Sequence, residues 1–274
     1  MDATYQLAFG MPGDPPWDSA DGKGAWVSDH RLVESVAADE EQVYLAAPHA
    51  EAGSAVIAVD YEGRKQWGVH HVRFYSLSGV AVAVDDDYLY VLVDAWREPI
   101  KQTYHEKYRL VLYRVDKKSG DYVEFGREEV RHVGSSMHGA HLRDDNFFRV
   151  VHIYDRSLLP APRLPEDWIA AGDHNPDWAR CNVLGMAHRD GTLYVSCYLE
   201  DKILVIDAHT GETKGELDVP SPRGVAVDPA GRLLAVSGRE VVVLDPAKGP
   251  IQTVVSQANG GLKAPVGLTA DRQG

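Results

Sequence analysis

Residues 222–249 read PRGVAVDPAGRLLAVSGREVVVLDPAKG, a stretch in which apolar segments alternate with short turns. The segment RGVAV leads into the turn DPAG, and the aliphatic segment RLLAVS follows. Short alternating segments on either side of an Asp-to-Gly turn predict a β-hairpin. A third segment, EVVVLD, ends in the turn DPAKG, and a more polar segment, PIQTVV, comes next. The stretch therefore predicts four consecutive antiparallel strands.

The same pattern recurs along the chain. Five segments share it, and they begin at Glu34, Ser78, His138, Leu184 and Arg223. A further segment begins at Val266 and ends with the chain. Four strands per unit of about 40 residues, repeated in this way, are typical of β-propellers. We therefore expect an all-β propeller of four-stranded blades, with about five recognisable blades plus the start of a sixth.

The pattern also predicts the domain organisation. Residues 34–274 should form the propeller domain, after an N-terminal segment of residues 1–33. Because the last unit stops after its first strand, two interpretations stay open. Residues 1–33 could supply the missing strands and close the ring, or the propeller is incomplete at its C-terminus. Unpaired strand edges of an open ring could pair with another copy, which predicts a homodimer.

Charge and hydropathy limit the partners. The formal net charge of −13 and the isoelectric point near 5.3 argue against binding to nucleic acid or to an anionic membrane, because both need a basic surface. No apolar run reaches the roughly 18 residues of a membrane span, and the N-terminus does not resemble a signal peptide. The sequence predicts a soluble cytoplasmic protein, or an extracellular or periplasmic one if the chain is an excerpt of a longer protein.

Loop lengths distinguish the two ends of the predicted propeller. The turns from first to second strand and from third to fourth strand share one end, and they are short. The other end carries the remaining connections, which include the long segments 67–77, 94–108, 127–137 and 155–181. Long loops on one end of a rigid scaffold are a common place for binding sites. We therefore expect ligand binding at the long-loop end.

Polar and aromatic residues in these loops are the candidates for binding a small molecule or a carbohydrate. They are His71, His105, Trp168, Asp173, His174 and Trp178. The two tryptophans could instead pack within their own loop. His188 and His209 belong to short turns of the opposite end, where we expect them to be exposed to solvent.

With this repeat, shown best by residues 222–249, the chain resembles the NHL and SMP-30-like propellers, a superfamily that includes gluconolactonases and organophosphate hydrolases. The resemblance covers residues 34–274. It implies that the residue before the Gly-like position of each innermost strand faces the central channel. In the SMP-30-like hydrolases, a Glu, two Asn and an Asp at such positions hold a catalytic calcium.

Carried over by position, the ring of channel residues is Glu34, Ser78, His138, Leu184, Arg223 and Val266. Only Glu34 matches the ligand pattern of these hydrolases. Glu34, His138 and Ser78 could still hold a divalent metal, zinc or calcium. Two alternatives stay open, since Glu34 could form an ion pair with Arg223, or the channel could be polar only because water fills it.

The resemblance implies a metal-assisted hydrolase of small esters, lactones or phosphotriesters, with the active site at the channel mouth. In that hypothesis His138 acts as acid or base, and Arg223 stabilises developing negative charge. The alternative hypothesis is a non-catalytic propeller module that binds carbohydrate or protein through its long loops. The sequence contains no GxSxG, P-loop or HExxH motif that would indicate another mechanism.

Overall fold

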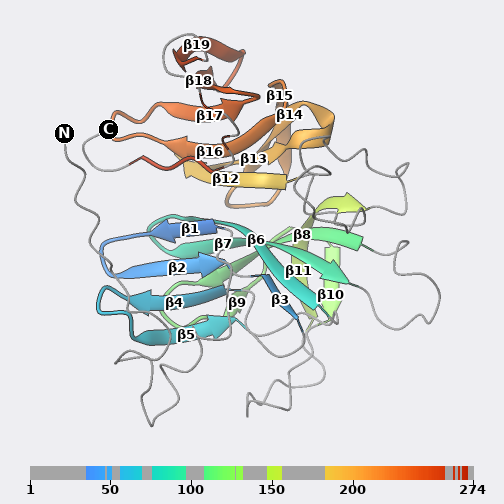
Figure 1. Ribbon diagram of the computed structural model, residues 1–274. Coiled ribbons are helices and arrows are strands. Elements are labelled where there is room, and N and C mark those ends of the chain that lie inside the picture. Colours follow the sequence, from blue (N-terminus) through green and yellow to red (C-terminus); the bar gives the residue numbers. More distant parts are fainter. Residues whose placement is uncertain are drawn as a thin grey trace.

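The computed structural model describes residues 35–46, 48–50, 56–69, 76–96, 108–126, 128–131, 147–155, 183–256, 262, 265 and 267–270. These residues form antiparallel β-sheets arranged as the blades of a propeller (Figure 1). The described residues also include a short 3-10 helix, Tyr198–Glu200. No helix in the described ranges is long and apolar enough to cross a membrane.

Four blades are present in the described part of the chain, each with four strands in sequence order from the channel outward. The first blade contains β1 (Ser35–Ala38), β2 (Gln42–Ala46), β4 (Val56–Asp60) and β5 (Lys65–Val69). The second contains β6 (Ser76–Val84), β7 (Tyr88–Trp96), β8 (Tyr108–Asp116) and β9 (Tyr122–Val123). The third contains β12 (Val183–Arg189), β13 (Thr192–Cys197), β14 (Lys202–Asp207) and β15 (Thr213–Asp218). The fourth contains β16 (Pro222–Val227), β17 (Leu233–Ser237), β18 (Glu240–Asp245) and β19 (Gly249–Val255).

The prediction of about five blades plus the start of a sixth is wrong for the described residues. The repeat that begins at His138 continues into β11 (Phe147–Asp155), and β11 pairs with β8 of the second blade. β10 (Glu128–Arg131) pairs with β11 on the outside. Because β6 and β12 contact each other directly, no blade lies between the second and third blades. A nine-residue β8 offers a longer edge than β9 covers, and β11 pairs with the remaining part.

The core lies between neighbouring blades. In β7, Leu89 and Val91 pack toward the first blade, whereas Tyr90 and Leu92 pack toward the third. Alternate side chains of a strand point to opposite faces of its sheet, so a strand buried on both faces is apolar at every position. This explains the unbroken apolar run YLYVLV in the second blade. A third cluster joins the third and fourth blades in the same way.

Aspartates form the short turns at one end of the blades. Asp39, Asp85 and Asp228 accept backbone N–H groups in the turns from first to second strand. Asp60, Asp116 and Asp207 do the same in the turns from third to fourth strand. We call this end of the propeller the turn end. Much of the acidic character of the chain therefore serves local turn geometry.

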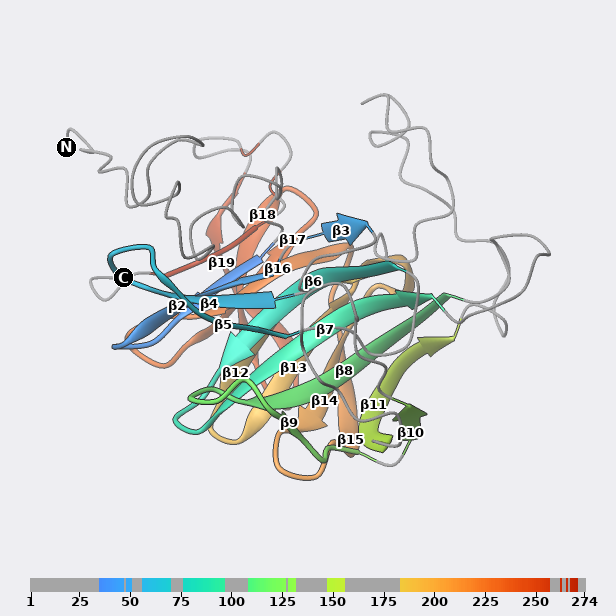
Figure 2. The ribbon, with the colours of Figure 1, turned by 90° about the horizontal axis from the view of Figure 1, so that it is seen from below.

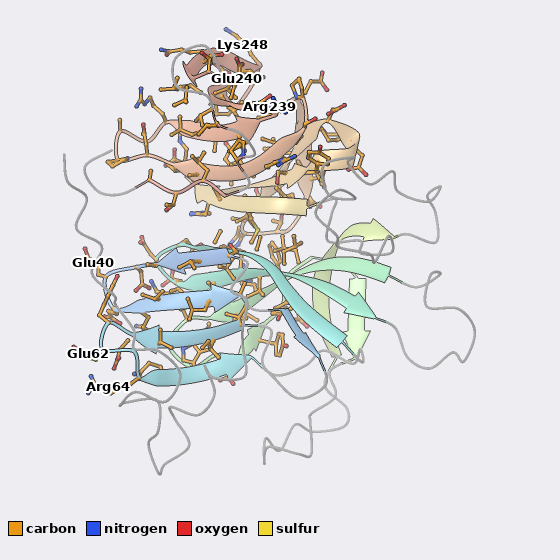
Figure 3. The ribbon with its side chains drawn as sticks, in the orientation of Figure 1. Glu40, Glu62, Arg64, Arg239, Glu240 and Lys248 are labelled. Carbon is orange, nitrogen blue, oxygen red and sulfur yellow. The ribbon has the colours of Figure 1, made fainter. Side chains whose placement is uncertain are left out.

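Charged side chains gather on the outside of the blades. Figure 3 shows Glu40, Glu62 and Arg64 at the turn end of the first blade, and Arg64 forms ion pairs with Glu62 and Asp60. Arg239, Glu240 and Lys248 lie at the periphery of the fourth blade in the same view. The homodimer expected from unpaired strand edges stays a prediction.

Candidate functional site

The innermost strands enclose a cavity of about 610 Å³ along the propeller axis. Its walls come from β1, β6, β12 and β16, together with the segment 267–270. This last segment lies against β16, where an ideal Cβ built on Gly224 would be 2.4 Å from the Leu268 nitrogen. The cavity is therefore the central channel of the described blades, and five innermost segments surround it.

The described side chains that line this channel are mostly small and apolar. The lining consists largely of Gly, Ala and Val, and His188 is its one ionisable side chain among the described residues. No group of three or more His, Cys, Asp or Glu side chains in the described ranges is placed to hold a metal ion.

Strand register identifies the channel positions of each blade. The pairs Val84–Leu89 and Val227–Leu233 close the first hairpins of their blades, and His188–Leu193 takes the same place in the third blade. The innermost-strand members of these pairs are Val84, His188 and Val227. The residues four positions before them are Val80, Leu184 and Arg223, and the register of each strand is irregular there. Ser78 lies two residues before this level, at the rung that β6 shares with Pro48 and Asp94.

Arg223 is the one predicted catalytic residue whose side chain the structure describes. It is only 5% exposed, and its guanidinium donates a hydrogen bond to the Pro265 carbonyl at 3.2 Å. The guanidinium carbon lies 5.1 Å from the centre of the Tyr198 ring, within cation–π distance. Arg223 therefore joins the third and fourth blades to the segment around Pro265. The equivalent positions Val80, Leu184 and Arg223 precede the strand segments that line the cavity, and none of them is a usual metal ligand.

The other predicted site residues lie outside the described residues. This holds for the proposed ligands Glu34 and His138. It also holds for the loop candidates His71, His105, Trp168, Asp173, His174 and Trp178. The strand ends that flank their loops are described, and they can be placed.

These strand ends lie at the end of the propeller opposite the turn end. β6, β7 and β8 are each nine residues long and extend past the blade here. β3 (Pro48–Ala50) pairs with residues 76–78 on the inner edge of β6, and β11 pairs with residues 109–112 of β8. Figure 2 shows β3, β10 and β11 around this extension. We call the end formed by β3, β10, β11 and the extended strands the extended end.

Two long loops leave the extended end from adjacent rungs. Arg109 of β8 pairs with Ala95 of β7 on one side and with Asp155 of β11 on the other. The next rung pairs Trp96 with Tyr108, and the β7–β8 ladder ends there. The loops that contain His105 and Trp168 begin at these positions. Two aromatic residues therefore occupy the last backbone rung of the extended end, next in the chain to a segment that the sequence predicts to bind ligand.

His188 differs from the expectation of a solvated turn residue. Its side chain is 16% exposed, and its ring stacks on Tyr90 with 5.8 Å between ring centres and 13° between planes. Burial lowers the pKa of His188 below its ordinary value, although Asp85, Asp190 and Asp86 act in the opposite direction. The sequence HRDG gave no sign of this contact, because Tyr90 comes from the neighbouring blade.

Comparisons with known proteins add little. No family model and no curated protein matches the chain. A solved structure of a protein of unknown function from Bacteroides caccae is 12% identical, with a TM-score of 0.48, over 82% of this chain and 61% of that chain. Glutaminyl cyclase from Myxococcus xanthus is 10% identical, with a TM-score of 0.44, over 84% of this chain and 72% of that chain.

A gluconolactonase from Xanthomonas campestris is 14% identical, with a TM-score of 0.38, over 77% of this chain and 59% of that chain. The chain thus spans less than two thirds of the length of the Bacteroides protein and of the gluconolactonase. At such identities and TM-scores, none of these similarities supports an assignment of activity.

Proposed function

We propose that this protein is a non-catalytic β-propeller that binds carbohydrate at its extended end. The observation that carries the proposal is the lengthening of the second blade into a broad sheet with β3, β11 and β10. The remaining blades have strands of four to seven residues and no such addition in the described ranges. A rigid sheet that supports several loops is a favourable platform for a binding site.

Carbohydrate is the favoured ligand because of the residues placed there. Trp96 and Tyr108 share the last rung of the β7–β8 ladder. Aromatic residues give a binding site large apolar surfaces, and their polar tips can form hydrogen bonds. The loops that start nearby contain further Trp, His and Asp residues, including Trp168, Asp173 and Trp178. This combination suits a ligand with both apolar and hydroxyl-bearing faces.

Metal-assisted hydrolysis at the channel mouth is the second candidate. The cavity reaches Ser35, which directly follows Glu34, and it also reaches Gly224, which directly follows Arg223. That placement agrees with an active site at the level of the predicted ring. Against it stands the donor set, because the described positions Val80, Leu184 and Arg223 do not fit a metal.

A binding screen of the purified full chain tests the first proposal. We expect the protein to bind at least one member of a panel of immobilised plant, fungal and bacterial polysaccharides. The same preparation should hydrolyse ester, lactone and phosphotriester substrates no faster than the buffer does. Hydrolysis that a chelator abolishes, and that is lost on His138→Ala, would instead support the second candidate. Capture of a protein and of no polysaccharide would contradict the carbohydrate proposal.

A further inference from the structure

At the turn end, the boundary between the first and second blades contains an aspartate, Asp39, and a lysine, Lys117. The Asp39 carboxylate accepts a hydrogen bond from the Tyr44 hydroxyl at 2.8 Å. Lys117 comes from the third-to-fourth turn of the second blade, and its Nζ lies 3.0 Å from Asp39 Oδ2. The same ammonium donates to the backbone carbonyl of Asp85 at 3.0 Å. A cation therefore sits opposite the acid at any pH near neutrality.

The next boundary repeats this arrangement with a different base. Asp85 accepts a hydrogen bond from the Tyr90 hydroxyl at 2.7 Å, as Asp39 does from Tyr44. The place of Lys117 is taken by Ala208, which is only 2% exposed. His188 lies there instead, with its Nε2 3.9 Å from Asp85 Oδ2.

The sequence changes at this position are coordinated across the blades. The residue equivalent to His188 is Val84 in the second blade and Val227 in the fourth. At the third boundary, Arg189 stands where the other blades have the acid, and Pro246 stands at the place of Lys117. A basic residue thus lies near the aspartate at each of the two boundaries that contain such an aspartate. It is a lysine in the first case and a histidine in the second.

The environment of His188 opposes its protonation. Its Nε2 is buried and has no hydrogen-bond partner among the described residues. Burial is the larger influence on its pKa and lowers it, while the charges of Asp85, Asp190 and Asp86 oppose that effect. Two cations also lie at this boundary, since Arg114 donates to the His209 carbonyl and Lys117 to the Asp85 carbonyl. The imidazole is therefore neutral at neutral pH, and it packs on the face of Tyr90.

We propose that His188 makes the boundary between the second and third blades sensitive to acid. Protonation places a charge on a largely buried ring whose Nε2 is 3.9 Å from the Asp85 carboxylate, beyond hydrogen-bond distance, so the packing on Tyr90 is lost and the boundary loosens. The first boundary has a lysine, Lys117, in place of the histidine, so we expect no response there in this pH range.

The sign of the effect follows from proton binding. A histidine whose pKa is lowered by folding binds fewer protons in the folded state than in the unfolded state. Stability then falls as pH decreases below the unfolded value of about 6.5. This is the reverse of a histidine that gains a strong acidic partner on folding. Each pH unit by which the folded pKa lies below the unfolded value raises the unfolding equilibrium constant about tenfold at low pH.

Urea unfolding of the full chain at about pH 7.5 and about pH 5.5 tests the proposal. The wild type should lose stability at the lower pH. His188→Val and His188→Gln should lose most of this pH dependence, because neither side chain titrates. His209→Gln is the matched control, since His209 is an exposed histidine at the same boundary. It should behave like the wild type.

Amide hydrogen exchange shows which strands are destabilised by acid. On acidification, amides of β7 and β12 should exchange faster after correction for intrinsic rates, and those of β2 and β4 should not. The double variant His188→Val/Ala208→Lys rebuilds the residues of the first boundary, and it should be insensitive to acid in this range. The proposal is overturned if His188→Val keeps the full pH dependence, or if NMR shows that His188 titrates at or above about 6.5.

Discussion

Gly224→Ala is expected to destabilise the propeller by about 3 kcal/mol, as measured by urea unfolding. An added Cβ at this position would lie 2.4 Å from the Leu268 nitrogen and 2.7 Å from the Gly267 carbonyl carbon. Both contacts are with backbone atoms, which cannot move aside by a change of rotamer. The fifth innermost segment would have to leave β16, and the channel wall would open.

Gly215→Ala is the control for this prediction. Gly215 also lies in a strand, but an added Cβ there meets no atom within 4 Å. Its replacement should be neutral or should stabilise the fold by about 0.5 kcal/mol, because alanine restricts the unfolded chain. If Gly224→Ala is as stable as Gly215→Ala, segment 267–270 does not pack on β16 as described.

Asp39→Ala is expected to cost about 3 kcal/mol of unfolding free energy. The carboxylate accepts the backbone N–H groups of Glu41 and Gln42, the Tyr44 hydroxyl and the Lys117 ammonium. Its removal leaves a largely buried tyrosine hydroxyl and a partly buried cation without their partner. Asp245→Ala is the control, since the Asp245 carboxylate accepts the Ala247 N–H but forms no hydrogen bond or ion pair across a blade boundary with any residue that the structure describes. That change should cost only about 1 kcal/mol.

The same carboxylate contributes to stability against acid. Burial alone would raise the pKa of Asp39, but hydrogen bonds from Glu41, Tyr44, Gln42 and Lys117 outweigh it and lower the pKa to about 2. A lowered pKa means that the folded state holds fewer protons, so this stabilisation is complete above about pH 4 and is lost toward pH 2. Stability of Asp39→Ala should therefore fall less steeply over this interval than that of the wild type. Equal slopes for the two proteins would contradict the assigned contacts.

The four-stranded blades were predictable because their signals are local. The turns around Asp228 and Asp245 are marked by Asp and Gly, and the apolar alternation on each side is short range. The pairing of β11 was not predictable in this way. Its sequence, FFRVVHIYD, resembles a strand of any blade, and it pairs with the part of the long strand β8 that β9 does not cover.

The channel positions were predictable only in part. Leu184 and Arg223 lie one residue before glycines that line the cavity, as the repeat implies. In the second blade, the glycine of the pattern is Gly79, which precedes the hairpin pair at Val84 by five residues, whereas Gly185 and Gly224 precede theirs by three, so Val80 and not Ser78 lies at the common level. Alignment of the repeats on their glycines therefore misplaces the second blade, and alignment on the turns places it correctly. The role of His188 depends on a neighbouring blade, and no local signal indicates it.

The most direct test of the proposed binding site is a measurement of affinity. The Trp96→Ala variant is compared with the wild type for the polysaccharide that the wild type binds best. Tyr61→Ala is the matched control, because Tyr61 is 54% exposed and belongs to the turn end. We predict that Trp96→Ala weakens binding at least about tenfold, the equivalent of about 1.4 kcal/mol, and that Tyr61→Ala binds like the wild type. Equal affinities for Trp96→Ala and the wild type, or a loss confined to Tyr61→Ala, would contradict a binding site at the extended end.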